Sequence, residues 1–212
     1  IHATKPYANA KSLQFRLGFW EGLVRQDQQQ VAIRFEFEGV ALVLHPPAVA
    51  RAPLPPGGDF TLQSADGPVA RAGLRGQVVP IYFGYATCPD ACPTTLGFTT
   101  LALKMLTPGE LARVKVIFVS VDPNRDTPAK LRQYVGHFHP NIIGVTGEVP
   151  ALGEVGLRYG AVFRYTPVSS AAIYVVDHTS ITSVVAPDGR LVEQLPHGTT
   201  PKDIVAAIRR WL

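Results

Sequence analysis

VVPIYFGYATCPDACPTTL, residues 78–96, is the stretch that decides the fold. Its first half, from Val78 to Tyr85, is mostly β-branched or aromatic, with Gly84 as the break before the turn, and predicts a buried strand. After Cys92 the apolar residues change to a spacing that suits a helix. The only two cysteines, Cys88 and Cys92, therefore lie where a central strand passes into a helix. Backbone N–H groups and the positive end of the helix dipole are free at such a junction, so we expect the chemistry of the protein there.

The spacing Cys-x-x-x-Cys allows two kinds of chemistry. Residues four apart on a helix share a face, so the two sulfurs can close a disulfide or turn towards one soft metal ion. Proline lacks an N–H and is tolerated only in the first helical turn, so Pro93 predicts a helix that begins near Asp90. Cys88 then lies in the preceding loop and Cys92 in the first turn. We expect both thiols to have a lowered pKa, because a helix start favours thiolate.

Composition narrows the class of protein. The 212 residues are 46% hydrophobic and 17% charged, which indicates a globular chain with one fair-sized domain and an extension. The net charge is +4, but no run of Lys or Arg would track phosphates, so nucleic-acid binding is not expected. No stretch reaches the roughly 18 apolar residues of a membrane span. Because the chain starts at Ile1, we interpret it as a processed product without its signal or anchor.

The chain divides at a Pro/Gly segment, PLPPGG at 53–58. We predict an N-terminal extension at 1–57 and a main domain at 58–212. Within the extension, apolar and polar residues alternate over 31–38, which predicts a half-buried strand. Gly39 breaks it and 40–44 is apolar, so we expect a β-hairpin, and we assign no role to 1–52.

The main domain contains alternating strand and helix signals. A small hairpin turns at Asp66-Gly67, and Thr127-Pro128 and Thr200-Pro201 are typical helix starts. The other predicted elements are strands at 114–122, 142–145 and 173–176, a weak helix at 150–159, and a hairpin around 187–189. Asp177 and His178 are expected in a turn after the strand at 173–176. The order strand–helix–strand–helix, then hairpin and helix, predicts an α/β, thioredoxin-like fold with an N-terminal β-hairpin and insertions.

Three blocks of the main domain resemble the Sco family (SCO/SenC) of copper chaperones for cytochrome c oxidase. They are FGYATCPDACPTTL, FVSVDPNRDTPAKLRQYV, and VDHTS followed by PDGRLVEQL, and the resemblance covers about 58–212 in order and spacing. It implies a thioredoxin-like fold in which Cys88, Cys92 and His178 bind copper. The residues that match the family pattern without being ligands are Asp90, Asp122, Pro123, Arg125 and Asp126. Where many relatives carry Thr-His before the first cysteine, this chain has Ala86-Thr87, a change outside the ligand set.

The resemblance also implies a partner and a compartment. The partner is the CuA domain of cytochrome c oxidase subunit II, with other copper chaperones or thiol reductants as further partners. The protein would bind Cu(I) and Cu(II) and act by metal delivery, by thiol–disulfide reduction of the CuA cysteines, or by both. It is expected to be a metallochaperone rather than a conventional enzyme. The expected location is the bacterial periplasm, with the full-length protein tethered to the inner membrane. The alternative is the mitochondrial intermembrane space.

The rival interpretations are a thiol peroxidase and a general thiol–disulfide oxidoreductase on the same fold, with Cys88 and Cys92 as the catalytic dithiol. Peroxiredoxins place Thr three residues before the reactive Cys, where this chain has Tyr85 or Pro89. The oxidoreductases normally carry Cys-x-x-Cys and a cis-proline in the facing loop, where this chain has His178.

The structural alternative for the cysteines is an inert disulfide, but a bond between residues four apart closes so short a loop that it would stabilise the fold little. Position alone would make His178 a turn residue. In thioredoxin-like folds, however, its loop faces the cysteine helix. Asp177 is a weak candidate to orient His178, since adjacent residues rarely face each other. His137 and His139 are not expected to chelate, and the surface histidines are His2, His45 and His197.

Overall fold

The computed structural model describes residues 14–16, 19–26, 29–38, 41–45, 53–167 and 174–212. The chain forms two compact units, Ile1–Pro53 and Leu54–Leu212, and each is described by itself.

The first unit contains a four-stranded antiparallel sheet in the order β1-β2-β3-β4. Its strands are β1 (Gln14–Arg16), β2 (Phe19–Gln26), β3 (Gln29–Glu38) and β4 (Ala41–His45). The predicted hairpin is confirmed, because β3 pairs antiparallel with β4. Gly39, the predicted break, lies outside the described residues. The sequence did not predict β1 and β2.

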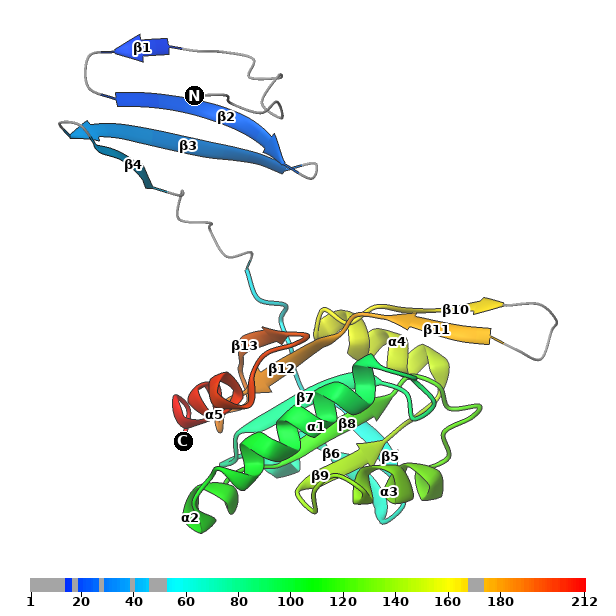
Figure 1. Cartoon of the computed structure of the whole chain (residues 1–212). Coiled ribbons are helices and arrows are strands. Elements are labelled where there is room, and N and C mark those ends of the chain that lie inside the picture. Colours follow the sequence, from blue (N-terminus) through cyan, green and yellow to red (C-terminus); the bar gives the residue numbers. More distant parts are fainter. Residues whose placement is uncertain (1–13, 17–18, 27–28, 39–40, 46–52, 168–173) are drawn as a thin grey trace. The chain divides into compact units, whose positions relative to one another are not determined.

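The second unit is built on a five-stranded sheet with the order β13-β12-β7-β8-β9 (Figure 1). Its strands are β7 (Val79–Gly84), β8 (Val116–Ser120), β9 (Ile142–Val145), β12 (Ile181–Val185) and β13 (Leu191–Pro196). The first three run parallel, and β12 pairs antiparallel with both β7 and β13. Every residue of β7 and β8 is buried, as expected for central parallel strands covered on both faces.

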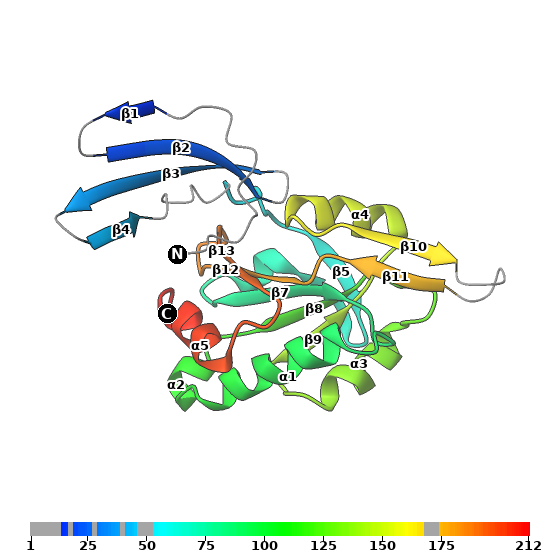
Figure 2. The same ribbon diagram turned by 45° about the horizontal axis from the view of Figure 1, so that its top comes forward.

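Helices lie on both faces of this sheet (Figure 2). They are α1 (Ala91–Lys104), α2 (Pro108–Leu111), α3 (Pro128–Gly136), α4 (Val149–Arg158) and α5 (Pro201–Arg209). In Figure 2, α1, α3 and α5 lie below the sheet and α4 lies above it. The connections β7–α1–β8 and β8–α3–β9 advance in one direction along the sheet, so right-handed crossovers place α1 and α3 on the same face.

The predicted helix starts are confirmed. Asp90 is the N-cap residue of α1, so Cys88 precedes the helix and Cys92 lies in its first turn. The Thr127 hydroxyl accepts a hydrogen bond from the Lys130 N–H at the start of α3. Thr200 caps α5 in the same way. Each of these threonines is followed by a proline at the first helical position, where the missing N–H costs nothing.

Two small hairpins complete the unit. The predicted turn at Asp66-Gly67 joins β5 (Thr61–Ser64) to β6 (Gly67–Ala70), and the 3-10 helix η1 (Arg71–Leu74) follows. The second pair is β10 (Phe163–Pro167) with β11 (Tyr174–His178). The expectation of a turn at Asp177-His178 is wrong, because both residues belong to β11, where Asp177 pairs with Arg164 and His178 with Phe163.

The observed order confirms the predicted α/β, thioredoxin-like architecture. Within the described residues, no helix combines the length and the apolar character needed to cross a membrane.

Candidate metal centre

The three residues expected to bind metal come from three elements and meet at one place. Cys88 lies in the loop between β7 and α1, Cys92 is the second residue of α1, and His178 is the last residue of β11. Their ligand atoms, two Sγ and one imidazole nitrogen, all lie within 4.8 Å of one another. Cys92 Sγ and His178 Nε2 lie 3.4 Å apart. Both cysteines are free thiols.

Cys92 is the enclosed member of the cluster. Its side chain has 0% exposure, and the hydroxyl of the buried Tyr82 donates a hydrogen bond of 3.7 Å to its Sγ. Burial raises the pKa of the Cys92 thiol to about 12, and the neighbouring Cys88 adds to this effect. The expected lowering of this pKa is therefore wrong. Sγ points back against β7, so loss of hydration outweighs the field of the helix start.

Cys88 is half-buried, in a loop fixed by backbone contacts. Its N–H donates to the Tyr85 carbonyl at 3.2 Å. The fully buried carboxylate of Asp126 accepts two bonds of 2.7 Å at Oδ2, from the Ala86 N–H and the Ser120 hydroxyl. Asp126 thus ties the start of the cysteine loop to the end of β8.

His178 presents one ring nitrogen to Cys92 and the other to its own backbone neighbour. Its Nδ1 lies 3.3 Å from the Thr179 carbonyl oxygen, which can only accept a hydrogen bond. This contact favours the tautomer with the proton on Nδ1, which leaves the Nε2 lone pair free for a ligand. Burial lowers the pKa of the imidazole, so the neutral form that a metal requires is favoured.

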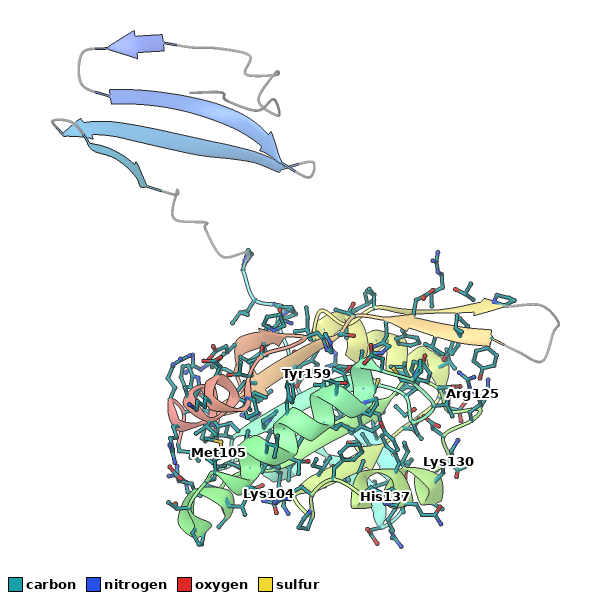
Figure 3. The ribbon with its side chains drawn as sticks, viewed as in Figure 1. Lys104, Met105, Arg125, Lys130, His137 and Tyr159 are labelled. Atoms are coloured by element: carbon teal, nitrogen blue, oxygen red, sulfur yellow. The ribbon has the colours of Figure 1, made fainter. Side chains whose placement is uncertain are left out.

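Aromatic rings and a cation hold β11 beside the cysteine loop. The rings of Tyr82 and Tyr85 meet the His178 ring edge to face, with centroids 6.2 and 5.7 Å away. The guanidinium carbon of Arg125 lies 4.0 Å from the centroid of the Tyr174 ring, and the same guanidinium donates a hydrogen bond of 3.0 Å to the Tyr174 carbonyl. Figure 3 shows Arg125 beside the β10–β11 hairpin.

Asp122 links Arg125 to Tyr174. Its carboxylate is fully buried, accepts a hydrogen bond of 2.6 Å from the Tyr174 hydroxyl and forms an ion pair with Arg125. Asp122, Arg125 and Asp126, which match the family pattern, therefore hold β11 and the cysteine loop in place without belonging to the Cys88–Cys92–His178 group.

Asp177 does not orient His178. Its carboxylate accepts a hydrogen bond of 2.8 Å from the Thr166 hydroxyl and lies 3.8 Å from the Arg164 guanidinium. The backbone carbonyl of Thr179, rather than Asp177, orients the His178 ring.

The other histidines whose side chains the structure describes, His137, His139 and His197, lie outside the cluster. His137 is the C-cap residue of α3, and His139 is buried, with its Nδ1 accepting from the Asn141 N–H at 3.1 Å. His197 is exposed, as predicted, and its Nδ1 lies 3.2 Å from the Thr95 hydroxyl. His2 and the side chain of His45 lie outside the described residues.

Sequence reasoning missed Tyr82, Tyr85 and Tyr174 as neighbours of the site. Alternation along β7 indicates that Tyr82 and Gly84 share a face, but it does not reveal which helix covers that face. The contacts of Tyr174 depend on pairing between β10 and β11, and β10 was not predicted.

The donor set fits a soft metal ion. Two sulfurs and one imidazole suit Cu(I), and thiolates select it over hard cations. Structural zinc wants four protein ligands, whereas the cluster found in the described part of the chain offers three. An open coordination position would let another protein's ligand reach the metal.

Comparison with known proteins points to one family. The SCO1/SenC family model matches residues 49–212. A bovine mitochondrial SCO2 homologue is 35% identical over 158 residues, which are 73% of this chain and 59% of that protein. The chain thus spans less than two thirds of this relative.

Two solved structures extend the likeness. Bradyrhizobium japonicum ScoI with copper bound is 34% identical, with a TM-score of 0.67 over 74% of this chain and 99% of that one. BsSco, described as having a disulfide switch and as a member of the Sco family of cytochrome c oxidase assembly proteins, is 25% identical. Its TM-score is 0.56 over 74% of this chain and 93% of that one.

Proposed function

The chain belongs to the SCO1/SenC family, and from this premise we propose that it is a copper chaperone for assembly of the CuA site of cytochrome c oxidase. The observation that carries the proposal is the convergence of Cys88, Cys92 and His178, with ligand atoms within 4.8 Å of one another. Copper is the cargo, held by two sulfurs and the Nε2 of His178. The copper bound to a relative with 34% identity supports this choice of metal.

Delivery and reduction are both compatible with this dithiol. In delivery, a ligand of the acceptor replaces the sulfurs one at a time, and the half-buried Cys88 is the accessible one. In reduction, Cys88 attacks the acceptor disulfide and Cys92 then attacks the mixed disulfide. Two electrons and two protons pass to the acceptor, and the chaperone keeps a Cys88–Cys92 disulfide.

We infer that the acceptor is the CuA domain of subunit II, with other copper chaperones or thiol reductants as upstream partners. We place the protein in the bacterial periplasm, tethered to the inner membrane in its full-length form. The mitochondrial intermembrane space is the alternative, and similarity to a bovine mitochondrial protein supports it.

The test mixes the purified protein with a soluble CuA domain in two arms. In one arm the protein carries Cu(I) and the acceptor is reduced and metal-free; formation of the CuA absorption reports delivery. In the other arm the reduced, metal-free protein meets an acceptor whose copper-site cysteines form a disulfide, and mass spectrometry of trapped thiols reports reduction. Activity in either arm supports the proposal, and inactivity in both contradicts it.

Thiol peroxidase or general oxidoreductase activity is the second candidate. It rests on the paired thiols and the thioredoxin-like fold. Peroxide turnover and reduction of a generic disulfide substrate, measured beside a copper titration, separate the two functions. The chaperone proposal predicts copper binding with negligible turnover of either substrate.

A further inference from the structure

Gly84 leaves the space that the sulfur of Cys92 occupies. Gly84 is the last residue of β7, and a Cβ added there would lie 2.6 Å from Cys92 Sγ. The same atom would lie 3.0 Å from Phe118 and 3.1 Å from Tyr82. No positive φ accompanies these contacts, so backbone conformation does not require a glycine at this position. Glycine inside a strand weakens it, and a close approach by another group is one reason for its presence.

We propose that Gly84 is a positioning residue for the copper cluster, because its missing side chain lets Cys92 Sγ seat against β7 within reach of His178. The inference rests on the proposed function only in that the cluster holds copper. The space beside Gly84 that Cys92 Sγ occupies, called the seat below, is a property of the metal-free protein. Gly84 is not a copper ligand and acts only through the position of one sulfur.

If a side chain were added at position 84, the sulfur of Cys92 would move more easily than the rings of Tyr82 and Phe118. Tyr82 and Phe118 are almost fully buried and stack with centroids 6.2 Å apart. Non-bonded heavy atoms pack at about 3.5–4.0 Å, so a methyl group at position 84 would displace Sγ by about 1 Å. The sulfur now lies 3.4 Å from His178 Nε2 and 3.7 Å from the Tyr82 hydroxyl. A shift of this size would disturb both contacts.

Gly144 offers a matched control in the same sheet. It lies on β9, and an added Cβ would meet Leu131 Cβ at 3.0 Å and the Leu131 carbonyl oxygen at 3.2 Å. This crowding resembles that at Gly84, but none of the three nearest atoms belongs to the copper cluster. Gly144→Ala therefore measures the effect of overpacking the core alone. Gly84→Ala measures the same effect together with displacement of the Cys92 sulfur.

The first experiment compares Gly84→Ala and Gly144→Ala by thermal unfolding and by Cu(I) competition with a chromophoric chelator. Both variants should melt earlier than wild type, because each overpacks the core. Gly84→Ala should weaken Cu(I) binding about tenfold or more, as is typical when support of a metal ligand is lost. Gly144→Ala should stay within about twofold of wild type. Equal affinity of wild type and a folded Gly84→Ala variant would overturn the inference.

A second experiment needs no copper and covers the case in which Gly84→Ala folds poorly. Cys92→Ala removes the sulfur that conflicts with the new methyl group. In a double-mutant cycle on the metal-free protein, Gly84→Ala should therefore lower the melting temperature less in the Cys92→Ala background than in wild type. Equal losses in both backgrounds would overturn the inference. If the wild-type protein bound no copper but the loss were smaller in the Cys92→Ala background, the proposed function would be refuted, and the inference that Gly84 makes room for the Cys92 sulfur would stand.

Discussion

The loop that carries Cys88 is partly open to solvent, whereas the first turn of α1 encloses the sulfur of Cys92 completely. The loop is fixed through its backbone, by the Cys88 N–H on Tyr85 and by Asp126 on Ala86. The sulfur of Cys92 is fixed directly, against Gly84 and Tyr82. Two chemically identical residues four positions apart are therefore prepared for different tasks. We infer that Cys92 and His178 form the fixed part of the proposed copper site and that Cys88 is the ligand that a partner can reach.

Serine substitutions should give the largest effect and separate the two cysteines. Cys88→Ser and Cys92→Ser each remove one soft ligand, so each should weaken Cu(I) binding by at least about a hundredfold. Only Cys92→Ser should also destabilise the metal-free protein, by about 1–2 kcal/mol, because it buries a hydroxyl whose shorter C–O bond fits the contacts of the sulfur with Tyr82 and His178 less well. Chelator competition and urea unfolding measure the two quantities. Equal destabilisation by both variants would break the comparison.

Thiol reactivity should differ by at least about tenfold between the two cysteines of the reduced, metal-free protein. Burial raises the pKa of Cys92 to about 12, so little of it is thiolate at pH 8, and its sulfur is enclosed. Alkylation by iodoacetamide, followed by peptide mass spectrometry, should label Cys88 first. In guanidinium chloride the two rates should converge. Faster labelling of Cys92 in the folded protein would contradict the assigned roles.

His178→Ala should have a smaller effect, which depends on the oxidation state of copper. Two thiolates suffice to hold Cu(I), whereas Cu(II) prefers nitrogen and oxygen donors, so Cu(II) affinity should fall about tenfold and Cu(I) affinity less. Paired titrations of wild type and variant measure this, with circular dichroism as the folding control. Unchanged Cu(II) affinity in the folded variant would show that His178 is structural only.

The pH dependence of stability gives the smallest predicted effect. Burial lowers the pKa of His178 below its ordinary value of 6.5, so on acidification the unfolded chain takes up this proton before the folded protein does. The metal-free wild type should therefore lose stability as the pH falls below about 6.5 and stop losing it below the native pKa. His178→Ala should lack this part of the decline. Parallel pH curves of thermal stability for the two proteins would argue against a buried, neutral imidazole.

Much of the fold could be predicted because local signals were strong. The buried strand at 78–85, the change of period after Cys92 and Pro93 placed the strand and the helix on either side of the cysteine motif, and Pro128 and Pro201 marked the starts of α3 and α5. By contrast, β1, β2, β10 and the one-turn helix α2 were missed. The alternation of Phe163 and Tyr165 with Arg164 and Thr166 was a usable strand signal for β10.

The properties of the candidate site were less predictable than its residues. The position of Cys92 at a helix start argued for a lowered thiol pKa, but the pKa is set by the wall that faces the sulfur. That wall contains Gly84 and Tyr82, and its contact with α1 is a tertiary feature that no spacing reveals. His178 was expected in a turn, whereas strand pairing with Phe163 fixes it.

X-ray absorption at the copper edge of the Cu(I)-loaded protein tests the central claim most directly. The cluster of Cys88, Cys92 and His178 predicts two sulfur neighbours and one nitrogen or oxygen neighbour per copper, at one copper per chain. Copper retained by the reduced but not the disulfide form after desalting is the matched control, since a disulfide sulfur is a poor ligand. A spectrum with only nitrogen and oxygen neighbours would contradict the account, because copper would then be bound away from both cysteines.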